Sequence, residues 1–202
     1  MKILMHACCG PCTIEPAYLL REEGHDLSFA FFNPNIAPFE EHQKRVSELK
    51  NFCEREGFRV IEFPYEQSLW EESVAPYAHH KAKRCKACYD LRLNACAVYA
   101  KNQGFDALST TLTVSPYQYI QSIKSSLKKA AESVGIQAIF RDFTPYYEDS
   151  VRDSRALVMY RQNYCGCRFS AVEAGFDRVR AKHERHLDKA QAYAEKSLSQ
   201  LS

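Results

Sequence analysis

Five short apolar runs separated by longer helical patterns constrain the fold of this chain more than any other feature of its sequence. The runs are nearly continuous rather than alternating, which is typical of strands that are buried on both faces of a parallel sheet. They therefore predict an α/β fold, a Rossmann-like parallel sheet with helices on both faces. The predicted strands are Lys2–Met5, Leu27–Phe32, Phe58–Phe63, Ala107–Thr111 and Ile136–Phe140.

Helix signals fill the segments between these strands. Thr13 suits the position that caps a helix, and a helical pattern follows it as far as Glu23. From about residue 150 the chain reads as further helices, interrupted at Tyr164–Arg168, and we expect these to be the C-terminal part of a single domain over residues 1–202. The other predicted helices are Pro38–Glu56, Cys85–Gln103, one that opens at Ser115 and Pro116, and a charged one from Arg178 to Leu201.

The composition excludes several classes of protein. With 46% hydrophobic and 12% aromatic residues, the 202-residue chain has enough apolar mass for a core and is not a disordered protein. Its longest apolar runs are too short to span a bilayer, so we expect no membrane association. The net charge of +2 gives no general attraction to nucleic acid, so any basic surface must be local. The N-terminus lacks the pattern of a signal peptide, which predicts a cytoplasmic protein with reduced thiols.

Nine cysteines are many for a cytosolic chain of this length, and seven of them fall in three tight groups. The first group directly follows the first predicted strand, at the edge where parallel sheets bind ligands. Thiolates separated by two residues commonly chelate one metal, and a tetrahedral zinc or a [4Fe–4S] cluster takes up to four ligands. Seven cysteines exceed one such site and indicate two adjacent sites. The groups are Cys8, Cys9 and Cys12; Cys85 and Cys88; and Cys165 and Cys167.

The cysteine spacing by itself leaves alternatives open. Cys9 and Cys12 could form a thioredoxin-like dithiol at the start of a helix, and the groups could also hold structural zinc. On spacing we favour an iron–sulfur site with a second site beside it. Cys53 and Cys96 stand alone within helical patterns and are expected to be small buried hydrophobic residues. His6 could donate a hydrogen bond to a metal ligand or be an ordinary core histidine.

Two further patterns favour an RNA partner. Six basic residues between His79 and Lys86 adjoin the second cysteine group and could hold a phosphate backbone. Tyrosines and arginines crowd the approach to the third group, and their planes are good stacking surfaces for an unstacked base. Both patterns also have a plain structural interpretation, as solvated or packed helix faces. The tyrosines and arginines are Tyr146, Tyr147, Tyr160, Tyr164, Arg152, Arg155, Arg161 and Arg168.

Taken in order, the motifs of this chain resemble those of the QueH-type epoxyqueuosine reductases. Each motif is weak by itself, whereas the ordered set is specific and covers most of the chain. The motifs are His6-Ala7-Cys8-Cys9-Gly10-Pro11-Cys12, Asn33-Pro34-Asn35-Ile36, Arg84-Cys85-x-x-Cys88-Tyr89-x-Leu91-Arg92, Ser109-Thr110-Thr111-Leu112, Ser115-Pro116-Tyr117 and Tyr160-Arg161-Gln162-x-Tyr164-Cys165-Gly166-Cys167.

The resemblance implies a fold, an activity and cofactors. The fold is that of the adenine-nucleotide-hydrolase-like (HUP) α/β proteins. The activity is the reduction of epoxyqueuosine to queuosine at the wobble position of tRNA, with electrons from an external one-electron donor and without cobalamin. The cofactors are a [4Fe–4S] cluster and a neighbouring mononuclear metal, expected to be iron. The loop Cys8–Cys12 replaces the phosphate-binding loop of ATP-pyrophosphatases of this fold, so we expect no use of ATP.

The resemblance also assigns the cysteines. The family has either Cys or Asp at the place of Cys12, which suits a ligand of the mononuclear metal and gives Cys12 a catalytic role. Cys85 and Cys88 are expected to bind the cluster. The helical part from about residue 150 is expected to close the metal site. One thiolate for each site is expected from each of the pairs Cys8/Cys9 and Cys165/Cys167.

Other residues of the motifs are expected to serve the substrate. Tyr117 and Tyr164 are candidate proton donors. Two functions from other classes stay open beside the reductase: a zinc-stabilised RNA-binding module and a thiol oxidoreductase. The expected substrate contacts are Asn33, Asn35, Arg92, Thr110, Thr111, Ser115 and Arg161, together with Lys81, Lys83 and Lys86 of the basic run.

Overall fold

A computed structural model of the chain describes residues 1–175. The chain forms two compact units, Met1–Arg161 and Gln162–Ser202, and the second is described as far as residue 175. The predicted helix Arg178–Leu201 lies outside the described residues. That the chain is a single domain whose C-terminal part closes the metal site stays a prediction.

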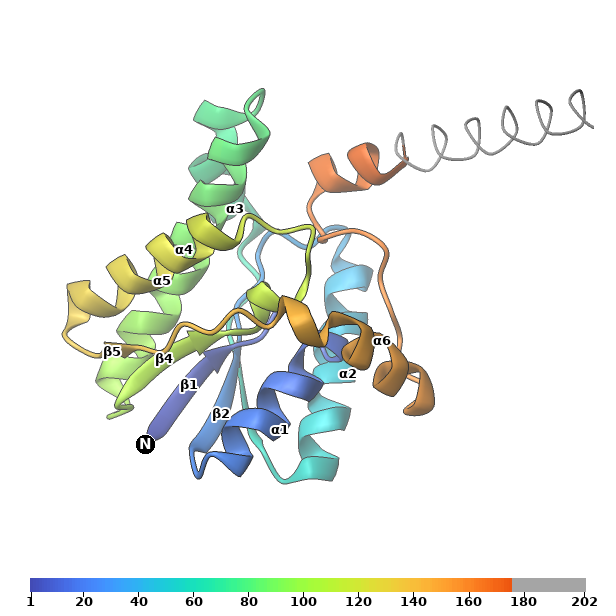
Figure 1. Cartoon of the computed structure of the whole chain (residues 1–202). Coiled ribbons are helices and arrows are strands. Elements are labelled where there is room, and N and C mark those ends of the chain that lie inside the picture. Colours follow the sequence, from blue (N-terminus) through green and yellow to red (C-terminus); the bar gives the residue numbers. More distant parts are fainter. Residues whose placement is uncertain (176–202) are drawn as a thin grey trace, which may run out of the picture. The chain divides into compact units, whose positions relative to one another are not determined.

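The first unit contains a sheet of five parallel strands in the order β3-β2-β1-β4-β5, which confirms the predicted α/β fold (Figure 1). The central strand β1 ends at His6, which lies opposite Ala30 of β2 and Thr110 of β4. The carboxyl ends of these three strands therefore meet at one edge, where open parallel sheets bind ligands. The strands are β1 (Lys2–His6), β2 (Asp26–Phe31), β3 (Arg59–Glu62), β4 (Ala107–Thr110) and β5 (Gln137–Ala138).

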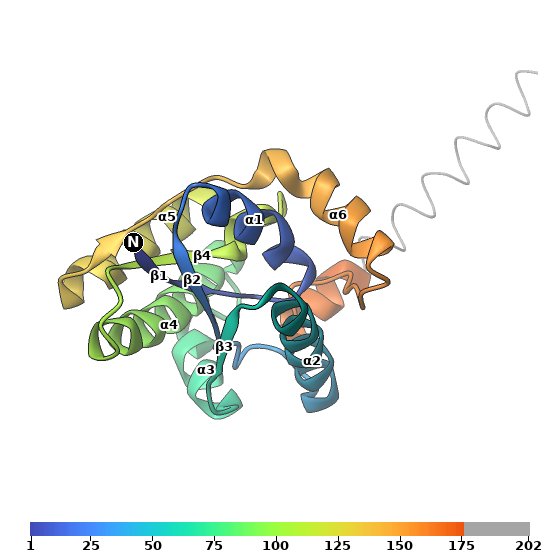
Figure 2. The ribbon, with the colours of Figure 1, turned by 90° about the horizontal axis from the view of Figure 1, so that it is seen from below.

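Helices cover both faces of this sheet, and Figures 1 and 2 show α1 and α4 on opposite sides of the strands. Alternate residues of β1 divide the core: Ile3 and Met5 pack with α1 and α2, whereas Leu4 packs with α4 and α5. The α-helices are α1 (Ile14–Glu22), α2 (Phe39–Glu56), α3 (Gln67–Val74), α4 (Lys81–Asn102), α5 (Ile120–Val134) and α6 (Tyr147–Ala156). Short 3₁₀ turns are η1 (Pro11–Thr13), η2 (Ala75–Tyr77), η3 (Thr111–Val114) and η4 (Thr144–Tyr146). No helix within residues 1–175 is long and apolar enough to cross a bilayer.

Several predicted boundaries were wrong. Helix α4 begins at Lys81, four residues before the predicted start at Cys85, so it includes most of the basic run. Helix α5 begins at Ile120 rather than at Ser115, because a turn closed by the Gln118 N–H and the Ser115 carbonyl oxygen comes first. The fifth strand is shorter than predicted, since Ile136 and Phe140 pack on the core without extending the ladder. Helix α3 was not predicted, and α6 begins before residue 150.

Candidate metal centre

The loop after β1 brings three thiols together. The sulfur atoms of Cys8, Cys9 and Cys12 all lie within 4.8 Å of one another. The loop passes close to α2 at Gly10, where the lack of a side chain leaves room for the α2 backbone. A Cβ at Gly10 would lie 3.2 Å from the backbone carbonyl carbon and oxygen of Glu48, inside normal contact distance. Sequence reasoning placed this group correctly, because the first loop of a parallel sheet starts at its carboxyl edge.

The chemistry of the three thiols suits a metal. They are free cysteines; Cys9 is fully buried, and Cys8 and Cys12 are half-buried. Hydrogen bonds from the thiols of Cys12 and Cys8 hold the pKa of Cys9 well below its ordinary value. Hydrogen bonds of Cys12 with Cys8 and then Cys9, together with burial, hold the pKa of Cys12 well above its ordinary value. Three sulfur atoms that lie this close, one of them readily ionised to a thiolate, are suitable ligands for zinc, iron or an iron–sulfur cluster.

Neighbouring strands hold this loop in place. Thr111 donates its hydroxyl to the Cys8 sulfur at 3.4 Å, and its oxygen accepts from the Cys8 backbone N–H at 3.1 Å. His6 is fully buried, with Nδ1 3.0 Å from the Thr110 hydroxyl and Nε2 3.3 Å from the Phe32 carbonyl oxygen. Burial, followed by the charge of Arg92, lowers the pKa of His6 to about 3. Because its two ring nitrogens lie against Thr110 and Phe32, the structure favours the core histidine of the two interpretations of His6.

The second cysteine pair lies on α4 and is not part of the three-thiol group. Cys88 is buried and Cys85 is half-buried. A chain of hydrogen bonds nevertheless links this pair to the loop. Arg92 donates from Nη1 to the Cys88 sulfur at 3.8 Å and from Nη2 to the side-chain oxygen of Asn33, and Asn33 donates to the Ala7 carbonyl oxygen at 2.9 Å.

The third pair belongs to the second unit. The sulfur atoms of Cys165 and Cys167 are 3.7 Å apart, and the backbone N–H of Ser170 donates to the Cys167 sulfur at 3.3 Å. Cys165 is exposed, whereas Cys167 is buried. The assignment of all seven cysteines to two adjacent metal sites stays a prediction. The two lone cysteines, Cys53 and Cys96, are fully buried in the apolar core, as expected.

The predicted substrate residues fall into two sets by exposure. The side chains of the buried set are at most 4% exposed. Four of them form hydrogen bonds at the cysteine groups: Asn33 with Ala7, Arg92 with Cys88 and Asn33, Thr110 with His6, and Thr111 with Cys8. It consists of Asn33, Asn35, Arg92, Thr110 and Thr111. The others are accessible to varying degree: Tyr117 is 81% exposed, Arg161 is exposed, and Ser115 and Tyr164 are half-buried. Contact with substrate stays a prediction for all of them.

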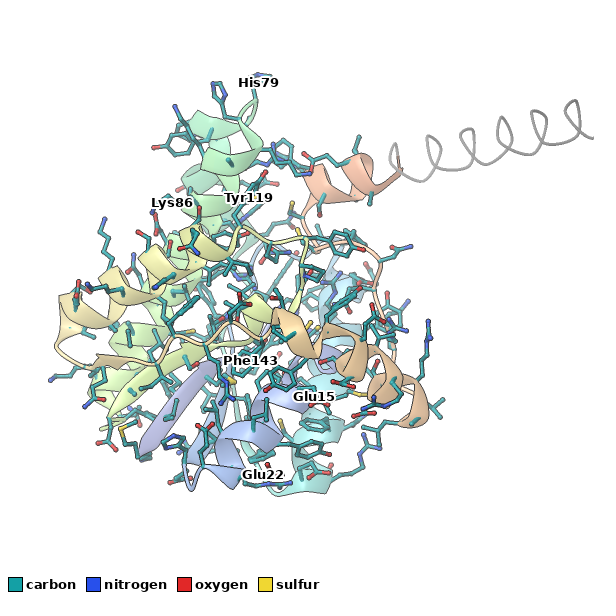
Figure 3. All side chains as sticks on the ribbon, in the orientation of Figure 1. Glu15, Glu22, His79, Lys86, Tyr119 and Phe143 are labelled. Atoms are coloured by element: carbon teal, nitrogen blue, oxygen red, sulfur yellow. The ribbon has the colours of Figure 1, made fainter. Side chains whose placement is uncertain are left out.

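The basic run lies at the start of α4. Figure 3 shows Lys86 on this helix and His79 at the tip of the segment that leads into it. Lys81 and Lys83 are exposed. Lys86 is half-buried and forms an ion pair with Asp90 at 2.8 Å. Arg84 is buried and donates to the Ala78 carbonyl oxygen at 2.7 Å. The exposed lysines are thus the members best placed to meet a phosphate.

Sequence reasoning missed a buried ion pair beside the thiols. Arg45 and Glu41 of α2 are 2% and 8% exposed and are paired at 2.7 Å, and the Tyr160 hydroxyl donates to Glu41 at 2.6 Å. The charge of Arg45 adds to the lowering of the Cys9 pKa, after the thiol hydrogen bonds and against the effect of burial. The one signal in the sequence was a Glu and an Arg four residues apart on a predicted helix, a spacing that usually marks a solvent-exposed pair.

The chain matches a family model described as "Epoxyqueuosine reductase QueH" over residues 3–173. Two similar proteins carry the name epoxyqueuosine reductase QueH. The one from Dehalococcoides mccartyi is 34% identical over 173 residues, covering 85% of this chain and 93% of that protein. The one from Thermotoga maritima is 33% identical over 178 residues, covering 85% and 91%.

Two solved structures share the fold. One is described as a predicted subunit of tRNA methyltransferase from Methanocaldococcus jannaschii, with a TM-score of 0.54, 13% identity, and coverage of 77% of this chain and 74% of that one. The other is the U34-tRNA thiolase NcsA from Methanococcus maripaludis with its [4Fe–4S] cluster, with a TM-score of 0.51, 15% identity, and coverage of 91% and 67%. At these identities the likeness concerns the fold alone. The family match over residues 3–173 and the relatives above 30% identity lead to one conclusion: the chain belongs to the QueH family of epoxyqueuosine reductases, which are oxidoreductases.

Proposed function

We propose that this chain reduces epoxyqueuosine in tRNA to queuosine at a metal centre built on its clustered thiols. The observation that carries the proposal is the convergence of Cys8, Cys9 and Cys12 in a member of the QueH family. The reaction takes two electrons and two protons, removes the epoxide oxygen as water and leaves an alkene. The electrons come from an external one-electron donor, the reaction uses no ATP, and the reducing cytoplasm keeps the thiols available.

The metal centre in this proposal consists of a [4Fe–4S] cluster and an adjacent mononuclear iron. Cys12 binds the single metal, and Cys85 and Cys88 bind the cluster. The remaining ligands come from the pairs Cys8/Cys9 and Cys165/Cys167. A [4Fe–4S] cluster is present in the NcsA thiolase, which has the same fold, and this supports the cofactor assignment. When bound, such a centre supplies a Lewis acid for the epoxide oxygen and a route for single electrons.

The substrate is held by groups of the chain that are exposed. Lys81 and Lys83 bind the phosphate backbone of the tRNA, since they are exposed cations at the start of α4. Tyr117 and Tyr164 are the proposed sources of protons, and Tyr117 is 81% exposed, so its hydroxyl can exchange protons with solvent.

Anaerobic reconstitution of the full chain tests this function. We expect iron and sulfide to bind with the brown absorbance of an iron–sulfur protein. With tRNA that carries epoxyqueuosine and reduced methyl viologen as donor, mass spectrometry of the nucleosides should detect a product that is one oxygen atom lighter. Cys88→Ser should lose both the cluster and the product. Cys53→Ala, which changes a buried thiol of the apolar core, should keep both.

The same experiment separates the alternative functions. A chain that binds zinc and tRNA but neither iron nor sulfide would be an RNA-binding module. Reduction of disulfide substrates that survives removal of all metal by a chelator would instead indicate a thiol oxidoreductase.

A further inference from the structure

We propose that Arg92 and Asn33 form a positioning pair that ties Cys88 on α4 to the cysteine loop after β1, and that Arg92 raises the reduction potential of the cluster held by Cys88. The inference rests on the proposed function, because it takes Cys88 to be a cluster ligand. Arg92 and Asn33 are positioning residues, since they act through Cys88 and the loop.

The position of Arg92 follows from the periodicity of α4. Cys88 and Arg92 are four residues apart and therefore lie on one face of the helix. From this face Arg92 donates to the Cys88 sulfur at 3.8 Å. Its guanidinium also donates to the side-chain oxygen of Asn33. Both hydrogen bonds involve a side chain that is only 4% exposed, so solvent competes little for these donors.

Asn33 completes the connection to the loop. It follows β2 and is 1% exposed. Both polar atoms of its amide form hydrogen bonds: the oxygen accepts from Arg92, and the nitrogen donates to the Ala7 carbonyl oxygen at 2.9 Å. Ala7 directly precedes Cys8. The pair therefore fixes the distance between α4 and the loop with two side chains that come from separate elements.

The charge of Arg92 favours the reduced state of a cluster. Reduction adds negative charge to the cluster and its thiolate ligands. A hydrogen bond to a ligating sulfur and a nearby cation both stabilise that charge, and these are factors that set cluster potentials. A buried guanidinium is in turn stabilised by negative charge close to it, so the thiolate and the arginine support each other.

The burial of both side chains distinguishes this role from substrate binding. Their hydrogen bonds are directed to groups within the protein, whereas a residue that grips tRNA must present its donor to solvent. Tyr117, at 81% exposure, illustrates the second kind. Their burial therefore fits support of the metal ligands and not the binding of tRNA.

Redox titration of the reconstituted chain tests the proposal, with iron and sulfide content measured in parallel. Arg92→Gln removes the charge but keeps a polar side chain. We expect normal cluster content and at least a tenfold lower ratio of reduced to oxidised cluster at a fixed potential, a shift of ~59 mV for one electron. Arg92→Lys should restore part of this shift, because it keeps the charge without the planar fork.

Arg84→Gln is the matched control. Arg84 is also a buried arginine of α4, and its guanidinium donates to the backbone oxygen of Ala78, which lies outside the connection between Cys88 and the loop. Its replacement should shift the potential much less. Asn33→Ala should shift it in the same direction as Arg92→Gln, and the double variant should shift it no further than Arg92→Gln does, because both changes disrupt one connection.

Three results would overturn the role of Arg92: an unchanged potential in Arg92→Gln, an equal shift in Arg84→Gln, or additive shifts of the two changes in the double variant. If Arg92→Gln takes up no cluster, Asn33→Ala decides, since a potential equal to that of the wild type would refute the pair. Absence of iron and sulfide in the wild-type chain would refute the proposed function and this inference together, whereas normal content with an unchanged potential refutes this inference alone.

Discussion

Gly10→Ala is expected to damage the metal centre through a single added methyl group. Gly10 has helical backbone angles, φ −57° and ψ −56°, so alanine is not excluded by conformation. It is excluded by space: the new Cβ would lie 2.6 Å from Cε of Met159 and 3.2 Å from the backbone carbonyl of Glu48. The methionine end can rotate away, whereas the backbone of α2 cannot, so the loop itself must shift by a few tenths of an ångström.

Two magnitudes follow from that shift. Overpacking of this kind costs roughly 1–3 kcal/mol. For a chain of this length that corresponds to a Tm lower by roughly 2–12 °C. Metal sites tolerate ligand displacements of only about 0.2 Å, so the variant should also bind less iron.

Calorimetry and iron analysis of the reconstituted chain measure both effects. Gly175→Ala is the control, because a Cβ there meets nothing within 4 Å, and it should leave the Tm and the iron content at or above the wild-type values. A Gly10→Ala protein with the Tm and the iron content of the wild type would refute the reasoning.

Three further predictions concern ligands, pH and tRNA. Cys12→Asp should keep the cluster and part of the activity, since carboxylate is an acceptable ligand for iron. Cys12→Ala should keep the cluster and lose turnover. Loss of the cluster in both variants would show that Cys12 is a ligand of the cluster instead. Burial and the adjacent carboxylates raise the pKa of Glu15 to about 7 from 4.5, so folding loses stability as the pH rises through this range. Glu15 is half-buried, so solvent screening reduces the effect to about 1 kcal/mol. Glu15→Gln should be more stable than the wild type by that amount above pH 7 and equal to it below pH 4.5, as measured by urea unfolding. A constant difference at every pH would contradict this. Reversal of Lys81, Lys83 and Lys86 to Glu should weaken tRNA binding and flatten its salt dependence with unchanged cluster content, and an unaltered salt slope in filter-binding assays would place the phosphate contacts elsewhere.

The sequence by itself determined the sheet, the position of the cysteine loop and the burial of the lone cysteines. Strands buried on both faces must be continuously apolar, and the loop after the first of them must lie at the carboxyl edge. These are properties of neighbours along the chain, so they can be read without the tertiary structure. Cys53 and Cys96 belong here too, since their helical neighbours already marked them as core residues.

The tertiary structure alone decided which polar side chains form hydrogen bonds with the thiols and with the residues beside them. Arg92 and Asn33 are 59 residues apart, and Tyr160 reaches Glu41 across 119 residues, so no local pattern pairs them. The motifs of the sequence led us to expect that Arg92 and Asn33 contact the substrate, and this stays a prediction. In the structure both side chains are buried, and Arg92 donates to the Cys88 sulfur while Asn33 donates to the Ala7 carbonyl oxygen.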